Sequence, residues 1–177
     1  MNLTAALRRY RSESLRQLFE IENYYQSLNF EDAVQNAAKA IVLGNKMDSH
    51  QFRIGRIKCE QGSVKLLKRL NDIRNCEDFD DLFDIVDDIK NDTFGLGDLW
   101  SYDTALRIGF NLAIYPENVF VQAGVRKGVR KVLGYIPSGR SIAPKLFPSL
   151  KKELLPYQIE NFLCLFGKDG KRNALAC

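Results

Sequence analysis

The residues whose types and spacing suit chemistry lie between Phe94 and Gly134. Two glycines, Gly95 and Gly97, flank one leucine and precede a segment of helical pattern. A glycine turn that leads into a helix leaves backbone N–H groups without intrahelical partners and positively polarised, which suits a phosphate. Glycine also permits positive φ and lets a ligand come close, because it has no Cβ. The spacing therefore predicts an anion-binding turn at Gly95–Gly97.

The same stretch ends in four closely spaced cations. They are Arg126, Lys127, Arg130 and Lys131. Residues 93–177 carry 12 Lys/Arg and 6 Asp/Glu, whereas residues 59–92 carry 5 and 10. A basic half of the chain beside a glycine turn favours a polyanionic partner. The charge alone is equally compatible with an ordinary solvated surface.

The segments that must position these residues are predicted to be helical, and strand patterns are nearly absent. Apolar residues at helical spacing predict helices over residues 2–27, 30–43, 48–59, 63–70, 76–92, 102–112, 125–133 and 157–166. Gly44 is predicted to end the second of them. The predicted fold is a single all-α domain, a helical bundle over residues 1–177, in which residues 168–177 are a polar tail.

Composition excludes several classes of protein. No apolar run approaches the roughly 20 residues that span a bilayer, so no membrane partner is expected. The N-terminus has no apolar segment after its first charges, so we expect no secretory signal. The cysteines lie far apart, without a CxxC pair, which is typical of reduced thiols in a cytoplasmic protein. They are Cys59, Cys76, Cys164 and Cys177.

A metal centre is not expected either. His50 is the only histidine, so no second imidazole is available for a metal site. Four aspartates of the acidic segment recur at helical spacing, which could serve a divalent ion, but a solvated face of an amphipathic helix explains them better. They are Asp80, Asp84, Asp87 and Asp88. The sequence predicts no metal and no cofactor.

Two further groups of residues are candidates for a pocket. His50 lies close to Gln51 and Arg53, and a structural hydrogen-bonding role competes with a binding role for this histidine. Trp100 and Tyr102 follow the glycine turn, where their rings could stack on bases or anchor the segment in the core. We favour the core for both aromatic residues.

Over residues 85–168 the chain resembles the helix-hairpin-helix DNA glycosylases, the superfamily of endonuclease III and 8-oxoguanine glycosylase. Three pieces carry the resemblance in the family's order. Gly95-Leu96-Gly97 followed by Thr104-Ala105 looks like the hairpin that holds a DNA phosphate. Residues 118–134 are similar to the segment that carries the catalytic aspartate, and residues 155–167 look like the helix that closes the domain. The resemblance implies a helix-hairpin-helix element and a DNA partner.

The departures from the family fall on the catalytic positions. Gln122 stands where the resemblance expects an aspartate, and Asp103 stands where some members carry a lysine nucleophile. Residues 98–103 look like an insertion that lengthens the hairpin. If the fold is shared, Asp103 and Gln122 would face one cleft, with Arg107 or Arg126 nearby. Asp103 would then act as a base or orient water, unless it caps the helix instead.

Three functions follow from these patterns. The first is DNA binding without standard glycosylase catalysis, through the amides of Gly95 and Gly97 and through basic side chains, namely Arg107, Arg126, Lys127, Arg130 and Lys131. The second is a catalytically inactive scaffold that binds a protein or a small ligand. The third is a divergent base-excision glycosylase that uses Asp103. DNA binding is the function that we expect.

Overall fold

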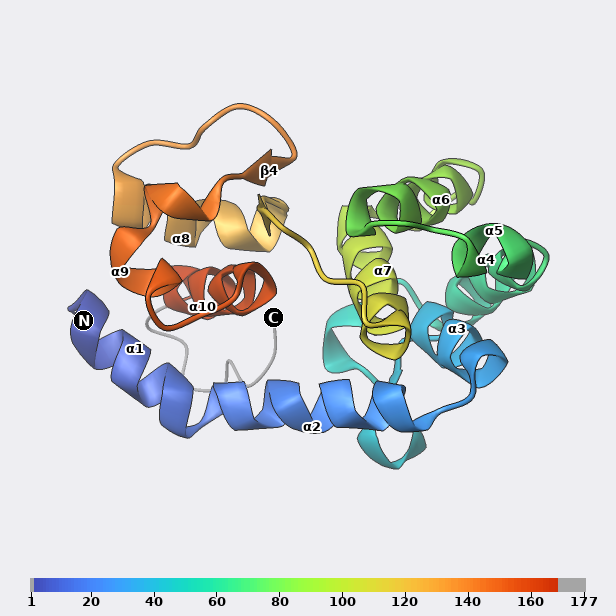
Figure 1. Cartoon of the computed structure of the whole chain (residues 1–177). Helices are drawn as coiled ribbons and strands as arrows, with labels where there is room; N and C mark the ends of the chain where they lie inside the picture. Colours follow the sequence, from blue (N-terminus) through green and yellow to red (C-terminus); the bar gives the residue numbers. More distant parts are fainter. Residues whose placement is uncertain (1, 169–177) are drawn as a thin grey trace. The chain divides into compact units, whose positions relative to one another are not determined.

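The computed structural model describes residues 2–168, in which helices predominate, so the all-α prediction is confirmed. The contacts divide the chain into two compact units (Figure 1). Unit 1 comprises residues 1–18 and 116–177, and unit 2 comprises residues 19–115. A single domain over the whole chain stays a prediction. The proposed polar tail, apart from Lys168, lies outside the described residues.

The core of unit 2 is built around a helix that is buried along most of its length, α7 (Asp98–Leu112). It packs against α3 (Phe30–Ala38) and α6 (Phe79–Asn91), and α4 (Arg56–Leu67) packs against both α3 and α6. The short helix α5 (Leu70–Arg74) connects α4 to α6. Asn29 caps α3 and Asp78 caps α6 with their side chains, as residues of these types favour.

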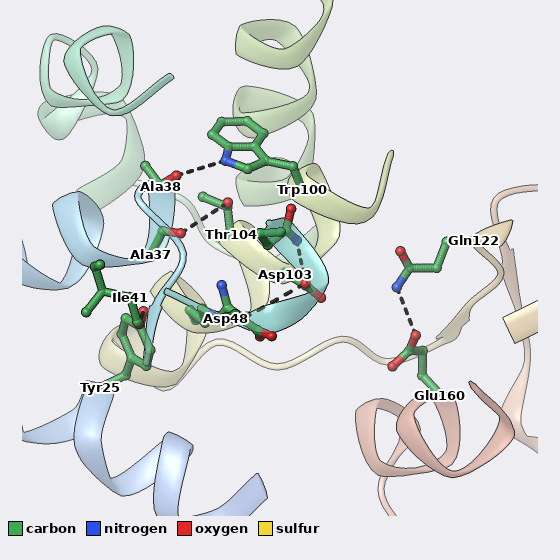
Figure 2. Close-up of polar contacts among 12 residues, drawn as sticks. Tyr25, Ala37, Ala38, Ile41, Asp48, Trp100, Asp103, Thr104, Gln122 and Glu160 are labelled. Carbon is green, nitrogen blue, oxygen red and sulfur yellow. Dashed lines mark hydrogen bonds and ion pairs between the residues drawn. The ribbon is translucent and has the colours of Figure 1, made fainter. Parts of the chain in front are cut away.

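Side chains of α7 bind backbone groups that other helices leave open at their C-termini. The indole Nε1 of Trp100 donates to the carbonyl of Ala38 at 2.8 Å (Figure 2). Asn111 Nδ2 donates, at 2.9 Å in each case, to the carbonyl of Tyr25 in the last turn of α2 (Ser14–Ser27) and to that of Leu28 just after it. The last carbonyls of a helix lack intrahelical partners, so these bonds satisfy groups that burial would otherwise penalise.

Two predicted helix boundaries in unit 2 are wrong because a β-hairpin follows α3. The predicted helix 30–43 ends at Ala38, and the antiparallel strands β1 (Ile41–Val42) and β2 (Lys46–Met47) come next. Gly44 and Asn45, in the turn η1 (Leu43–Asn45), have φ of 72° and 58°. Gly44 is therefore a hairpin residue and not a helix stop, since positive φ at such a turn is what glycine and asparagine tolerate.

The next two predicted helices are also different in the structure. Only a short 3₁₀ segment, η2 (Ser49–Gln51), occupies the start of the predicted helix 48–59, and α4 then runs from Arg56 through the predicted break to Leu67. Gly62 lies inside α4 because its bare Cα permits close packing: a Cβ there would lie 2.6 Å from the ring of Trp100. Glycine at this point serves helix packing and not a turn.

Unit 1 packs its helices around one apolar cluster. The cluster joins α1 (Leu3–Ser12), α8 (Ala123–Leu133), α9 (Pro148–Lys151) and α10 (Pro156–Gly167). The strands β3 (Val119–Phe120) and β4 (Ser141–Ile142) pair antiparallel, and η3 (Pro144–Leu146) follows β4. The predicted helix 2–27 is two helices, α1 and α2, because Glu13 interrupts it.

The closest helix contact in unit 1 lies at Gly128, where α8 meets α10. A Cβ at Gly128 would lie 1.9 Å from the backbone carbonyl oxygen of Leu163, so the helices touch backbone to backbone. Val125 and Val129 are fully buried on the same side of α8. The opposite side of α8 is therefore held in a fixed place relative to α10.

We expect Gly128→Ala to lower the free energy of unfolding of unit 1 by about 3 kcal/mol or more, because a backbone carbonyl cannot move aside as a flexible side chain would. Chemical denaturation followed by circular dichroism measures this loss. Gly97→Ala is the control, since a Cβ at Gly97 meets no atom within 4 Å. Equal stability of the two variants would contradict the close contact.

Candidate functional site

Three cations of α8 project away from the packed side of the helix. Arg126, Lys127 and Arg130 are exposed, and among the described residues none of them forms an ion pair. Arg126 and Arg130 are one helical turn apart, so they share a face. α8 contains no acidic residue. These side chains can therefore approach an anion without breaking an internal bond.

Lys131 differs from its three neighbours. Its Nζ donates to the backbone carbonyl of Phe166 at 2.8 Å and lies 5.3 Å from the centroid of the Phe166 ring. A lysine at the end of one helix that binds a last-turn carbonyl of another stabilises both ends. Lys131 adds positive charge to the face of α8, but its ammonium group also has a structural role.

The two units carry charge of opposite sign. Unit 1 has 15 Lys/Arg and 5 Asp/Glu, and unit 2 has 11 and 17. Two carboxylates of unit 1, Glu13 and Glu153, already pair with Arg9 and Arg11, and Glu160 is buried. The positive charge of unit 1 is therefore mostly uncompensated at its surface. The net charge of the whole chain is moderate because the negative charge of unit 2 offsets it.

The glycine turn is the connection between α6 and α7 in unit 2. Gly95 has φ of 96°, and Gly97 is the N-cap of α7. The predicted lengthening of the hairpin by residues 98–103 is wrong, as is the predicted helix start at residue 102, because residues 98–103 form the first turns of α7. Carboxylates flank the turn: Lys90 pairs with Asp98, and Lys65 pairs with Asp92. Each lysine reduces the repulsion that these carboxylates would exert on an anion.

Asp103 lies within α7, five residues after its start, and so cannot cap the helix; Gly97 holds that position. Its Oδ2 accepts a hydrogen bond from Gln51 Nε2 at 2.7 Å and lies 3.9 Å from Arg107 Nη2. Arg107 Nη2 also contacts Asp48 Oδ2 at 2.5 Å. Figure 2 shows Asp48 and Asp103 side by side in this cluster.

Arg107 is the centre of this cluster and is 6% exposed. Burial alone would lower its pKa, but Tyr25, Asp103 and Asp48 outweigh that effect and raise the pKa above the usual value. The guanidinium is therefore charged and neutralised internally. The prediction that Arg107 contacts a phosphate is not compatible with this burial, and the cluster has the features of a structural ion pair.

Gln122 is the N-cap of α8, in unit 1, and contacts α10. Its Nε2 donates to Glu160 Oε1 at 2.8 Å (Figure 2). Glu160 is 5% exposed and, after burial itself, is the next cause that raises the pKa of Tyr10. Glu160 was not predicted from the sequence, although a glutamate between Ile159 and Phe162 on the apolar face of a helix was a usable signal. Asp103 and Gln122 belong to different units, so their shared cleft stays a prediction.

The residues predicted to line a pocket are mostly part of the core. Trp100 and Gln51 are completely buried and Tyr102 is nearly so, which agrees with the core interpretation of the two aromatic residues. Arg53 is exposed. The backbone of His50 lies in η2, and its side chain is outside the described part of the structure.

The cysteines differ from one another. Cys59 and Cys76 are free thiols, and burial raises the pKa of Cys59 to about 11, so this thiol is unreactive at neutral pH. Cys164 is disulfide-bonded, so the expectation of four reduced thiols is wrong for this residue. Cys177 lies outside the described residues.

Across residues 2–168, no helix combines the length and apolar character needed to cross a membrane. The same part of the chain holds no group of three or more His, Cys, Asp or Glu side chains arranged to bind a metal ion. No family model matches the chain, and no curated protein or solved structure matches it either.

Proposed function

We propose that the protein binds double-stranded DNA through the exposed face of α8 formed by Arg126, Lys127 and Arg130. The observation that carries the proposal is that these three cations are exposed, have no ion-pair partner among the described residues and stand on a helix fixed by backbone contact with α10. Lysine and arginine on a rigid helix neutralise phosphates and release counterions, which provides most of the affinity for DNA.

The contacts expected from α8 are to the DNA backbone. Its exposed face offers lysine and arginine, whose commonest partners on DNA are phosphates, and only Arg126 and Arg130 could also pair with a base edge, that of guanine. Phosphate contacts position a protein on the duplex without reading its sequence. We therefore expect the affinity for DNA to depend weakly on base sequence. We also expect the net positive charge of unit 1 to speed association with DNA.

The turn at Gly95–Gly97 is the second proposed contact with a phosphate. Gly97→Ala adds a methyl group that meets no protein atom within 4 Å at a φ of −129°, so the fold should tolerate it. A phosphate held by the amides would, however, be displaced by that methyl group. We expect roughly tenfold weaker DNA binding, the size of one lost charge-assisted hydrogen bond, with only a small loss of thermal stability because alanine is a poorer N-cap than glycine.

Fluorescence anisotropy tests the proposed function. The full chain is titrated into labelled duplex, mismatched, abasic and single-stranded DNA over a series of salt concentrations. The proposal expects duplex binding that weakens steeply with salt. Absence of binding to every one of these DNAs would leave the scaffold for a protein or small ligand as the better explanation. Equal Kd values for Gly97→Ala and the wild type would remove the glycine turn from the interface.

A further inference from the structure

The chain connects the two units twice, because unit 2 is an insertion within unit 1. Unit 1 comprises residues 1–18 and 116–177, and unit 2 comprises residues 19–115. The first connection lies inside the helix α2, between Leu18 and Phe19, and the second connection follows Tyr115. Relative motion is the default expectation for compact units of one chain, so the contacts that hold these two connections determine how freely the units move.

The two connections differ in stiffness. The first is part of a continuous helix, which extends on both sides of Leu18. The second is irregular backbone, since residues 113–118, between α7 and β3, lie in neither a helix nor a strand. Hinges between domains are a few loop or element-terminal residues that absorb changes of φ and ψ. The second connection is therefore the place where a hinge forms, unless contacts hold it.

The side chain of Tyr115 fixes the start of the second connection to α2, through contacts that lie entirely within unit 2. Its Oη donates to Glu22 Oε1 at 2.8 Å and accepts a hydrogen bond from Gln26 Nε2 at 3.2 Å. Glu22 and Gln26 are one turn apart, so the hydroxyl binds two positions on one side of the helix. Burial and, after it, the hydrogen bond to Glu22 raise the pKa of Tyr115, so the hydroxyl is a donor at neutral pH.

The backbone before Tyr115 is fixed as well. Ala113 has a left-handed φ of 57°, and the N–H of Ile114 donates to the carbonyl of Gly109 at 2.9 Å. A Cβ at Gly109 would lie 2.4 Å from the carbonyl oxygen of Ile114, so the chain turns back directly against α7. The backbone therefore leads the chain back along α7, and the Tyr115 hydroxyl then binds it to α2.

We propose that Tyr115 is a latch that restricts the motion of unit 1 relative to unit 2. While its hydroxyl is bound to α2, both connections start from the same helix, and bending at the second connection is confined to the residues after Tyr115. When these hydrogen bonds break, the irregular backbone can bend from Ala113 onward, so the second connection becomes longer. The inference goes beyond DNA binding, since it concerns the motion of the unit that carries α8.

Tyr115→Phe in the full chain tests the latch, because it removes the hydroxyl and keeps the ring. We expect the Ile114 amide to exchange with deuterium roughly 10- to 100-fold faster, the effect of one lost hydrogen bond to a charged group. NMR relaxation of the backbone amides should give equal rotational correlation times for the two units in the wild type and different times in the variant. The matched control is Tyr24→Phe, which removes an α2 hydroxyl that accepts from Asn36 Nδ2 at 3.0 Å within unit 2. The control should change neither measurement.

Three results would overturn the latch. They are unequal correlation times of the units in the wild type, the same effects from Tyr24→Phe as from Tyr115→Phe, and correlation times that stay equal in Tyr115→Phe. In the last case, faster exchange at Ile114 would show that Tyr115 only stabilises the end of α7. Neither measurement involves DNA, so failure of the latch leaves the proposed interface on α8 in place, and absence of duplex binding leaves the latch in place.

Discussion

Arg107→Met is expected to lower the free energy of unfolding of unit 2 by about 3–5 kcal/mol, because it removes the cation from a buried pair and leaves the carboxylates behind. Asp48 and Asp103 are 13% and 14% exposed at their side chains, so water compensates them poorly. Urea denaturation followed by tryptophan fluorescence measures the loss. Trp100 is the only tryptophan and is buried in the same unit, so its emission reports on this unfolding.

The matched control for this experiment is Arg69→Met. Arg69 pairs with Asp72 on the surface, where the two side chains are 37% and 52% exposed. An exposed pair contributes about 0–1 kcal/mol. A triple variant of Arg107→Met, Asp48→Asn and Asp103→Asn should recover part of the stability, because it buries no net charge. If Arg107→Met costs no more than Arg69→Met, the buried ion pair does not stabilise unit 2 and Arg107 becomes available for another role.

Replacement of the three cations of α8 by glutamine is expected to weaken duplex binding roughly 10²- to 10³-fold at 0.1 M salt. The estimate follows from the release of about three counterions per complex. The variant carries Arg126→Gln, Lys127→Gln and Arg130→Gln, and its fold should persist because all three side chains are exposed and glutamine is a good helix former. Anisotropy with a labelled duplex measures the change in Kd.

A control variant that loses the same charge elsewhere in unit 1 distinguishes direct contacts of α8 with DNA from a general effect of net charge on affinity. Lys145, Lys151 and Lys152 are exposed, so their replacement by glutamine removes the same three charges. We expect this control to weaken binding by less than tenfold through the long-range field alone. An equal loss in the two triple variants would show that net charge, and not α8, determines affinity.

The sequence predicted elements whose boundaries depend on local signals. The helices predicted from residues 30 and 157 begin within one residue of the observed starts, because Asn29 caps α3 and Pro156 occupies the first turn of α10, as residues of these types favour. Elements set by tertiary contacts were predicted less well. Gly62 resembles a helix break in the sequence, but it lies inside α4 because the ring of Trp100 occupies the space beside it.

The cations of α8 could be predicted as a candidate interface, because their spacing along one amphipathic helix is visible in the sequence without knowledge of any contact with another element. The hydrogen-bonded pairs of polar side chains could not be predicted, since each pair joins residues that are distant in the chain. Asp103 meets Gln51, and Gln122 meets Glu160. Spacing along one helix indicates which side a residue occupies but does not indicate which neighbour it contacts.

The salt dependence of duplex binding by the wild-type chain tests the central proposal most directly. The slope of log K against log salt concentration counts the phosphates neutralised, at about −0.9 for each. Contacts from Arg126, Lys127 and Arg130 predict a slope of roughly −3, which should fall by about one for Arg126→Gln alone. A slope near zero, or a slope that Arg126→Gln leaves unchanged, would contradict a DNA interface on α8.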